Sequence, residues 1–478
     1  MRVGARARAA LVAGGIAGSV GACSLAPHYQ KPETAPAPSA YREASGWKLA
    51  MPADNESRGP WWTAFHDTTL DVLESQVTDA NQDLKGAFAR LQEARAQSRI
   101  AQAGQFPNVT ADGSANRTHA SLTSPSYNSK IPTTYDDYSG GIALSYEIDL
   151  FGRVRNTVAA ARATEQATAG DVAALELSVH AELAGDYLEL RGLDAQQALL
   201  DRTVADYQKA LQLTDALYRG GLADKSDVQQ ATAQLESART EAEDSRLRRA
   251  QTEHAIATLV GQQASDFQLP PRPLTPSSLP PPVDLGLPSQ LLERRPDVAA
   301  AERRVAAANA RIGVARAAYF PVFSLSGTAG TESFSLSDLM LAPSRTWSVG
   351  PQGVLTLFDG GLRRAQSAGA LAAYDEQVAG YRGSVLTAFR EVEDNLAALR
   401  QLERESVSQA AAVTATGAAL DLANHRYRSG LVTYLEVVST ENAALAANIE
   451  AVAIRTRQLT ASVLLIKALG GGWSVEAK

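Results

Sequence analysis

Hydrophobic and polar residues alternate along the chain in two different periods. Helical spacing runs over residues 69–105, and Phe106 with Pro107 predicts its end, because proline lacks the backbone N–H that a helix needs. Period two follows over residues 108–118 and 138–150. Each of these stretches therefore predicts a strand with one apolar face and one polar face.

Two further helical stretches follow the strands. The first covers residues 151–217, and at about 1.5 Å per residue it would reach on the order of 100 Å. It is rich in alanine, which lets neighbouring helices approach closely in coiled-coil fashion. Residues 218–222 (YRGGL) predict a turn in which glycine supplies the left-handed cap, and a returning helix covers residues 223–261.

The same series of elements occurs twice. Residues from Asp83 to Pro107 recur 214 positions later, and Tyr218 to Leu222 recur 209 positions later, with the Phe-Pro and turn signals at matching places. The prediction is therefore a duplicated unit. A signal peptide over 1–22 and an N-terminal extension over 23–68 precede the first repeat, which covers 69–261. A Pro-rich connector over 262–291 leads to the second repeat over 292–469, and a tail covers 470–478. Within the second repeat we expect strands 322–333 and 346–358 and helices 359–428 and 432–468.

The length of the strands bears on where they lie. About 10 to 13 residues is enough to cross a hydrocarbon layer at a tilt, whereas strands of soluble sheets usually have about 5 or 6. Long hairpins packed on a soluble core are the alternative. Four strands are too few to close a membrane barrel, because the smallest has about eight. A barrel would therefore need several copies of the chain.

Composition excludes several classes of protein. The 478 residues include 45 Lys+Arg and 52 Asp+Glu, so a net charge of −7 argues against a nucleic-acid-binding surface that covers the chain. Hydrophobic residues make up 45% and charged residues 20%, which favours an ordered chain. Beyond the leader, the sequence contains no apolar run of about 18 residues, so we expect no transmembrane helix.

The N-terminus has the layout of an export signal. Arg2, Arg6 and Arg8 precede an apolar stretch that ends in Val20-Gly21-Ala22 before Cys23, the only cysteine. This pattern resembles a bacterial lipobox, which implies a diacylglycerol thioether on Cys23 and an acylated amine, with palmitate as a typical chain. Several acyl chains anchor a protein stably where one does not. Ser24 follows, where aspartate would suggest inner-membrane retention.

The sequence offers no catalytic chemistry. It lacks a phosphate-binding Gly-Lys-Ser/Thr loop and a Gly-x-Ser-x-Gly turn, and its six histidines show no metal-ligand spacing. Helical carboxylates lie three or four residues from arginine, as Glu393 does from Arg390, which is typical of solvated faces. We therefore assign no catalytic residue, no metal and no cofactor other than the lipid on Cys23.

Several motifs together resemble those of the outer-membrane factors of tripartite efflux systems, in the OprM-like, NodT-type lipoprotein branch of the TolC-like channels. They are residues 61–62 (WW), 150–152 (LFG), 287–298 (LPSQLLERRPDV), 301–302 (AE), 309–313 (NARIG), 320–321 (FP), 427–430 (YRSG) and 468–473 (ALGGGW). They fall in family order and span nearly the whole mature chain.

This resemblance implies a mostly α-helical fold with a membrane β-barrel. A homotrimer would form a twelve-stranded outer-membrane barrel, with four strands per protomer, and a twelve-helix periplasmic α-barrel with an equatorial domain. It also implies a periplasmic adaptor and an inner-membrane RND-type transporter as partners, in a Gram-negative bacterium. The expected function is a passive exit duct for small amphiphiles or drugs. The alternatives are a type I protein-secretion duct and a periplasmic coiled-coil adaptor lipoprotein without a pore.

The resemblance also places a periplasmic gate near the second turn. It assigns Leu435 to a hydrophobic ring, with interhelix packing as the alternative, and Ser439 replaces an aspartate that relatives often have. Glu436 and Glu441 are candidates to replace the missing acid. In the first repeat the equivalent zone holds Asp224 and Asp227. The residues that could tie helices together or simply cap them are Tyr218, Arg219, Tyr427 and Arg428.

Three acidic residues fall in the polar register of the first two strands. They are Asp112, Glu147 and Asp149. In a barrel this register faces the lumen, where these carboxylates would either favour cations or keep the wall hydrated. The sequence does not identify the cargo, the cognate adaptor or the way in which the gate opens.

Overall fold

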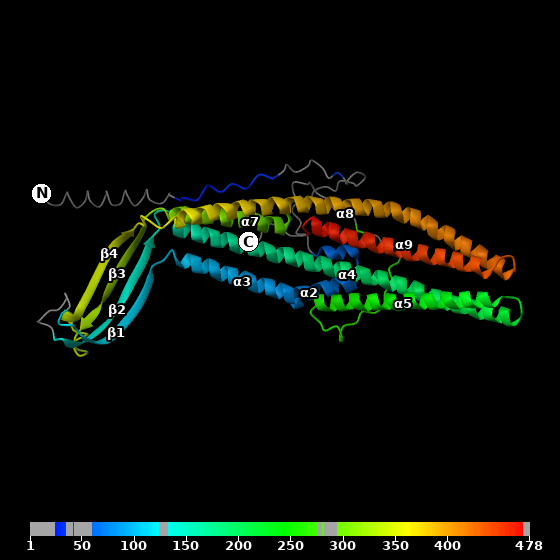
Figure 1. Cartoon of the computed structure of the whole chain (residues 1–478), viewed down its shortest axis with the longest axis horizontal. Helices are drawn as coiled ribbons and strands as arrows, with labels where there is room; N and C mark the ends of the chain where they lie inside the picture. Colours follow the sequence, from blue (N-terminus) through cyan, green and yellow to red (C-terminus); the bar gives the residue numbers. More distant parts are fainter. Residues whose placement is uncertain are drawn as a thin grey trace. The chain divides into compact units, whose positions relative to one another are not determined.

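The computed structural model describes residues 24–34, 42, 60–123, 132–275, 280–281 and 294–471. The predicted signal peptide, Cys23, much of the connector and the tail beyond residue 471 lie outside these ranges. The elements, labelled in Figure 1, are η3 (Trp61–Phe65), α2 (Thr68–Ala80), α3 (Gln82–Ala103), β1 (Asn108–His119), β2 (Thr134–Ile148), α4 (Arg153–Arg219), α5 (Lys225–Leu259), α7 (Pro296–Ala317), β3 (Val322–Ser333), η4 (Ala342–Ser344), β4 (Arg345–Val354), α8 (Leu362–Arg428) and α9 (Tyr434–Ala468).

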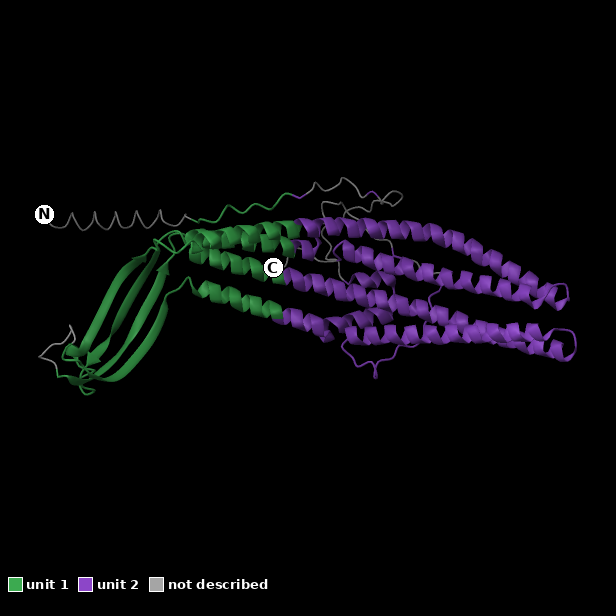
Figure 2. Cartoon of the chain, in the orientation of Figure 1, with its two compact units in different colours: residues 1–33, 90–168, 300–381 green, residues 34–89, 169–299, 382–478 purple. Residues whose placement is uncertain are grey.

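The chain forms two compact units, coloured separately in Figure 2. Unit 1 comprises residues 1–33, 90–168 and 300–381, and unit 2 comprises residues 34–89, 169–299 and 382–478. Each unit takes segments from both halves of the chain. The compact units are therefore a different division of the molecule from the two sequence repeats.

Most corresponding elements of the two halves have equal lengths, although β2 has 15 residues and β4 has 10. Helices α4 and α8 have 67 residues each, and α5 and α9 have 35 each. Helices α3 and α7 have 22 each, and strands β1 and β3 have 12 each. The two halves thus fold into the same series of elements at the spacing that the sequence repeats. None of the described helices is both long enough and apolar enough to cross a membrane.

The strands of unit 1 form one antiparallel sheet in the order β1-β2-β3-β4. Its register places Val109, Leu144, Gly327 and Val349 opposite one another in a single row. Directly opposite residues share a face, so the predicted alternation is confirmed. The apolar face carries Val109, Ala111, Ile142, Leu144, Tyr146, Ile148, Phe323, Leu325, Ala329, Trp347 and Val349.

The two faces of this sheet differ in their contacts. On the polar face, the Ser114 and Ser139 hydroxyl oxygens lie 2.9 Å apart across β1 and β2, and short polar side chains dominate. On the apolar face, Val109 is 60% exposed and Trp347 is 78% exposed. An apolar face of this extent in contact with water is unfavourable, since each square ångström costs about 25 cal/mol.

Several strand boundaries differ from the prediction by one to four residues, and β2 begins at Thr134 rather than at residue 138. Strand β2 ends at Ile148, and the Asp149 carboxylate instead accepts hydrogen bonds from the Val154 and Arg155 amides, at 3.2 and 2.8 Å, at the start of α4. Strand β4 ends at Val354 rather than at residue 358. Its last residue pairs with the first residue of β3, so the four residues beyond it have no strand opposite them in the described sheet.

The single helix predicted over residues 69–105 is wrong, because Asn81 divides it into α2 and α3. Asn81 has an extended backbone, with ψ of 128°. Its side-chain oxygen accepts from the Asp83 and Leu84 amides at 3.0 Å each, which caps α3. Its side-chain nitrogen donates to the Leu259 carbonyl at 2.9 Å, so Asn81 also ties this junction to the end of α5.

The described N-terminal segment, residues 24–33, lies on helices of unit 1. The Ser24 hydroxyl donates to the Asn156 side-chain oxygen of α4 at 3.1 Å. The Asn309 amide of α7 donates to the Pro27 carbonyl at 2.9 Å. The segment that follows Cys23 is therefore held by specific bonds.

A tyrosine and a glycine complete this seat. The Tyr29 hydroxyl donates to the Glu302 carboxylate at 2.7 Å. A Cβ added to Gly313 of α7 would lie 2.6 Å from the Ala26 Cβ, closer than two carbons can approach without a shift. Glycine at this position is what allows the segment to lie against the helix.

Unit 2 has a core of leucine, valine and alanine side chains from α2, α4, α5 and α9. At its centre, the His180 Nδ1 atom and the Glu74 carboxylate lie 2.5 Å apart, both nearly fully buried, and Trp62 stacks on the histidine ring with centroids 4.6 Å apart. Burial raises the pKa of Glu74 to about 7, although the hydrogen bond to His180 opposes this shift.

The first residues of the predicted connector are anchored in unit 2. Phe267 and Leu269 are buried in the core. The Arg249 guanidinium donates to the Leu269 carbonyl at 2.7 Å, and that of Arg191 donates to the Pro270 carbonyl at 2.9 Å. Pro270 itself is exposed, as expected for a segment that runs over the surface.

Candidate functional site at the helix turns

The two helix turns of unit 2 have the same backbone geometry. Gly221 and Gly430 have φ values of 71° and 70°, in the left-handed region. The Leu222 amide donates to the Leu217 carbonyl at 2.8 Å, and the Leu431 amide donates to the Arg426 carbonyl at 2.9 Å. These are the bonds of a glycine-terminated helix end, so the predicted glycine caps are confirmed.

The candidate residues at the first turn are not brought together by the structure. Tyr218 is exposed, and Arg219 pairs with Asp215 one helical turn earlier, at 2.7 Å. Asp224 precedes the first residue of α5 without a side-chain capping bond, and Asp227 lies in the first turn of that helix. The ion pair of Arg219 is therefore within α4 and ties no second helix.

At the second turn, by contrast, aromatic residues of α8 and α9 meet. The rings of Tyr427 and Tyr434 lie 5.4 Å apart, and Tyr434 is buried. The Arg426 guanidinium also reaches across from α8 to the Glu436 carboxylate of α9, at 2.8 Å. Arg428 lies beside this cluster and lines a cavity.

Helix α9 has two distinct faces after the second turn. Tyr434, Val437 and Glu441 are buried, whereas Leu435 is 59% exposed and Ser439 is exposed as well. Positions three, four or seven apart share a helix face, which explains the separation. The alternative that Leu435 packs between helices is not supported within the chain, and Glu441 lies on a different face from Ser439, so it does not supply the acid missing there.

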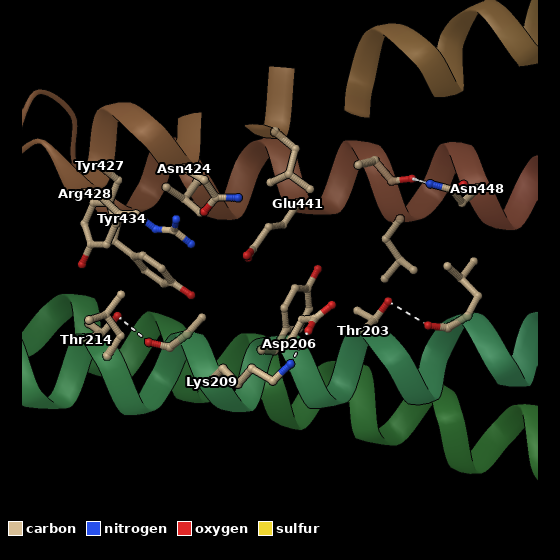
Figure 3. A pocket seen from close by; sticks show the side chains of 18 residues that line it. Thr203, Asp206, Lys209, Thr214, Asn424, Tyr427, Arg428, Tyr434, Glu441 and Asn448 are labelled. Atoms are coloured by element: carbon tan, nitrogen blue, oxygen red, sulfur yellow. Dashed lines mark hydrogen bonds and ion pairs between the residues drawn. The ribbon is translucent and has the colours of Figure 1, made fainter. Parts of the chain in front are cut away.

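A cavity of about 390 Å³ lies between the buried face of α9 and helix α4 (Figure 3). Asp206 of α4 lies on one side, and Tyr434 and Glu441 of α9 lie on the other. Tyr207 of α4 also lines the cavity. Sequence reasoning missed Asp206 and Tyr207. The only available signal concerned α9, where Glu441 lies seven residues after Tyr434 and therefore on the same helix face.

Burial controls the charges in this cavity. Glu441 is 9% exposed, and burial, followed by the neighbouring Asp206 carboxylate, raises its pKa to about 7. Burial likewise raises the pKa of Tyr207 to about 12 and raises that of Tyr434. Asp206 is exposed, and its carboxylate lies 3.1 Å from the Lys209 ammonium.

The three candidate lumen residues lie in different surroundings. Asp112 lies opposite Gly141 on the polar face of the sheet and is exposed. Glu147 shares that face but pairs with Arg153, whose Nε donates to its carboxylate at 2.7 Å. Asp149 lies beyond the end of β2 and caps α4, so its placement on a lumen-facing strand is wrong. Only Asp112 and Glu147 remain candidates for a lumen wall.

The described residues contain no group of three or more His, Cys, Asp or Glu side chains that could hold a metal ion. Cys23, the candidate lipidation site, lies outside the described residues.

Comparison with known sequences decides the family. The profile of the family "Outer membrane efflux protein" matches residues 73–262 and 287–471. The chain belongs to this family. The match covers both repeats, and the resemblance found from the sequence motifs is therefore confirmed.

Individual relatives agree with this assignment. The chain is 36% identical over 461 residues to the outer membrane protein OprJ of Pseudomonas aeruginosa, with 96% of this chain and 95% of OprJ covered. It is 34% identical over 456 residues to the toluene efflux pump outer membrane protein TtgC of Pseudomonas putida, with 95% and 93% covered. The solved structure of the outer-membrane channel OprN superposes with a TM-score of 0.88 at 32% identity, with 94% of this chain and all of that chain covered.

These findings establish an efflux protein of the outer membrane. They do not favour the alternative of a coiled-coil adaptor without a pore, since the matched proteins are named as channels and as outer-membrane components of pumps. The expected fold class, mostly α-helical with a membrane β-barrel, is shown as well. The similarity to OprN includes nearly all of the chain, with both the helices and the strands.

The left-handed glycine at the second turn can be tested directly. Gly430→Ala places a Cβ on a residue with φ of 70°, which should cost about 1 kcal/mol and make the turn open about fivefold more often. Hydrogen exchange at the Leu431 amide measures this opening. Gly417→Ala, in the interior of α8 with open space around the added carbon, is the control and should leave that exchange rate unchanged. Equal exchange rates in Gly430→Ala and the unmodified protein would contradict the capping role.

Proposed function

We propose that three copies of this chain join their sheets into a twelve-stranded outer-membrane barrel and act as a passive exit duct. The observation that carries the proposal is the sheet of unit 1, whose apolar face is exposed and whose outer strands, β1 and β4, each have a partner on one side only. Backbone groups left unpaired in hydrocarbon cost several kcal/mol each. Pairing β4 of one copy with β1 of the next removes both open edges.

The helices supply the periplasmic part of this duct. Each copy contributes the long helices α4 and α8 and the returning helices α5 and α9, so three copies form a twelve-helix barrel. The chain itself has no nucleotide-binding motif, so the energy for transport comes from a partner. By resemblance to the family, the partners are a periplasmic adaptor and an inner-membrane RND-type transporter, and the helix turns are the part that meets them. The cargo is a small amphiphile or drug.

Leu435 is the proposed hydrophobic gate. It lies five residues after Gly430, on the exposed face of α9, while its neighbour Tyr434 is buried. An exposed leucine near a helix turn has no packing role in a single chain. Three copies around an axis would bring three such leucines together, and a ring of this kind blocks water and ions by dewetting.

Cys23 is the proposed lipid attachment site. The residues that follow it are seated on α4 and α7 through Ser24 and Pro27, so the attached lipid would lie next to unit 1. This is the same unit that contains the proposed membrane sheet. Barrel and lipid would then enter the same bilayer.

The facing of the sheet can be tested with an arginine pair. Leu144→Arg places a charge on the apolar face, at a cost of about 2 to 4 kcal/mol near the bilayer midplane, so the amount of assembled trimer in the outer membrane should fall. Ser145→Arg, on the opposite face of the same strand, is the matched control and should assemble. Both are measured as heat-resistant trimer in outer-membrane fractions. Equal assembly of the two variants would overturn the assigned facing.

Conductance in planar bilayers tests the duct and its gate. The purified protein should form a pore of low conductance, and Leu435→Ala should raise that conductance severalfold because the ring becomes wider and less apolar. Leu386→Ala removes a leucine of α8 with nearly the same exposure, 60%, and should leave the conductance unchanged. Absence of any pore would contradict the exit duct, whereas equal conductance of Leu435→Ala and the unmodified protein would contradict the gate alone.

Labelling with radioactive palmitate tests the lipid anchor. The unmodified chain should incorporate the label, and Cys23→Ser should not, while the variant should still form trimers because the barrel inserts by its own apolar face. Ser24→Ala is the control and should keep the label. Labelling of Cys23→Ser would show that the acyl chain is attached elsewhere.

A further inference from the structure

The cavity between α4 and α9 contains a carboxylate oxygen that has no partner. Glu441 extends from α9 into this space, toward the side chains of α4 (Figure 3). Its Oε2 atom is buried and has no hydrogen-bond partner among the described residues, although the residue is only 9% exposed. A buried polar atom without a partner is costly, so this site calls for an explanation.

The cations near this carboxylate do not neutralise it. Lys209 pairs with Asp206, with a distance of 3.1 Å between nitrogen and oxygen, and both side chains are exposed. Arg426 pairs with Glu436 on the outside of α8 and α9. Arg428 also lines the cavity, yet no ion pair between it and Glu441 occurs among the described contacts.

Aromatic rings form much of the remaining wall. Tyr207, Tyr427 and Tyr434 all line the cavity, and the hydroxyl of Tyr427 is a second buried group without a partner in the described structure. Carboxylates combined with aromatic faces attract organic cations, through charge and through the negative face of each ring. The volume of about 390 Å³ also lies in the range of small-molecule sites.

We propose that this cavity binds a monovalent organic cation of the substituted ammonium class, held between Glu441 and Asp206 and in contact with the tyrosine rings. A metal ion fits less well, because the described residues offer no group of three acidic or histidine ligands there, and hard cations require more oxygen ligands than two carboxylates supply. The proposal rests on the geometry of the described residues of unit 2, and it does not depend on the trimer or on the duct.

Binding at this place would connect two helices. Asp206 belongs to α4 and Glu441 to α9, so a cation between them replaces repulsion of two like charges by attraction of both to one ion. Helices α4 and α5 form one pair, and α8 and α9 form the other. The only direct hydrogen bonding described nearby between the two pairs joins the side chains of Gln234 of α5 and Asn442 of α9, at 2.6 Å. An occupied cavity therefore stabilises the arrangement in which the two pairs lie together.

Calorimetry with benzyltrimethylammonium as the probe tests the proposal on the full-length protein in detergent. The unmodified protein should bind this cation, and Glu441→Gln should weaken binding by about tenfold or more, because one charge-assisted contact is lost while the shape of the side chain is kept. Asp206→Asn changes an exposed residue and should weaken binding as well without affecting the fold. Benzenesulfonate, an anion of similar size, should not bind.

The control variant is Glu450→Gln. Glu450 lies on the same helix, is exposed and pairs with Arg457 at 2.5 Å, so this variant removes the same charge from α9 outside the cavity. It should bind benzyltrimethylammonium as the unmodified protein does. Circular dichroism of each variant establishes that the helices have formed.

The pH dependence gives a second readout. The ionised carboxylate binds the cation, and burial followed by Asp206 raises the pKa of Glu441 to about 7, so affinity should rise between about pH 6 and about pH 8. Glu441→Gln should lose this rise. The other titratable or charged groups that face the cavity or act on its lining residues are Asp206, Tyr207 and Lys209 of α4, Asp227 and Glu241 of α5, Tyr427 and Arg428 of α8, and Tyr434 of α9.

Three results would overturn the proposal. They are absence of benzyltrimethylammonium binding by the unmodified protein, equal affinity of Glu441→Gln, and equal binding of benzenesulfonate. Each leaves the exit-duct proposal untouched, because pore formation in a bilayer is measured separately and needs no ligand in this cavity.

Discussion

Backbone hydrogen bonding in hydrocarbon is the constraint on which the rest of this molecule depends. A sheet of four strands has two outer edges, and its N–H and C=O groups there need partners when water is absent. No rearrangement inside one chain closes such a short sheet into a barrel. The proposed joining of several copies, and with it the proposed arrangement of the helices around a shared axis, follows from this one requirement together with the exposed apolar face.

The buried polar groups of unit 2 likewise need hydrogen-bond partners. Most buried polar side chains there have partners: Glu74 contacts His180, and the guanidinium groups of Arg191 and Arg249 hold the start of the connector by its carbonyls. Glu74 Oε1 and Arg191 Nε are buried without partners as well, but both residues make other bonds, whereas no bond of the Glu441 carboxylate occurs among the described contacts. A buried carboxylate without any described bond is more informative than the same residue on a solvated helix face.

Periodicity and turn residues predicted most of the fold, because they report local physical chemistry. Alternation placed Leu144 on an apolar face, and the glycines at 221 and 430 marked the two helix ends. What the sequence did not reveal depends on contacts between distant residues. Asn81 interrupts a regular helical pattern because its side chain also bonds to Leu259, which lies far along the chain.

The candidate site was predictable only in part for the same reason. Resemblance to the family pointed to the second turn, but the burial of Glu441 arises from α4, whose Asp206 and Tyr207 are more than 230 positions away in sequence. The assignment of Asp149 to a strand failed because a carboxylate just before a helix caps it rather than continuing the ladder. Spacing along one segment carries no information on such competition between elements.

The short side chains on the polar face of the sheet have a consequence for what such a pore can discriminate. Serine, threonine and glycine dominate this face, and several hydroxyls bond to one another across strands, as those of Ser114 with Ser139 and Thr328 with Ser348 do. Short hydroxyls narrow a conduit little and exchange hydrogen bonds readily with water. Such a lining is permissive toward solutes of different shape, so discrimination among them has to be exercised before they reach this part of the protein.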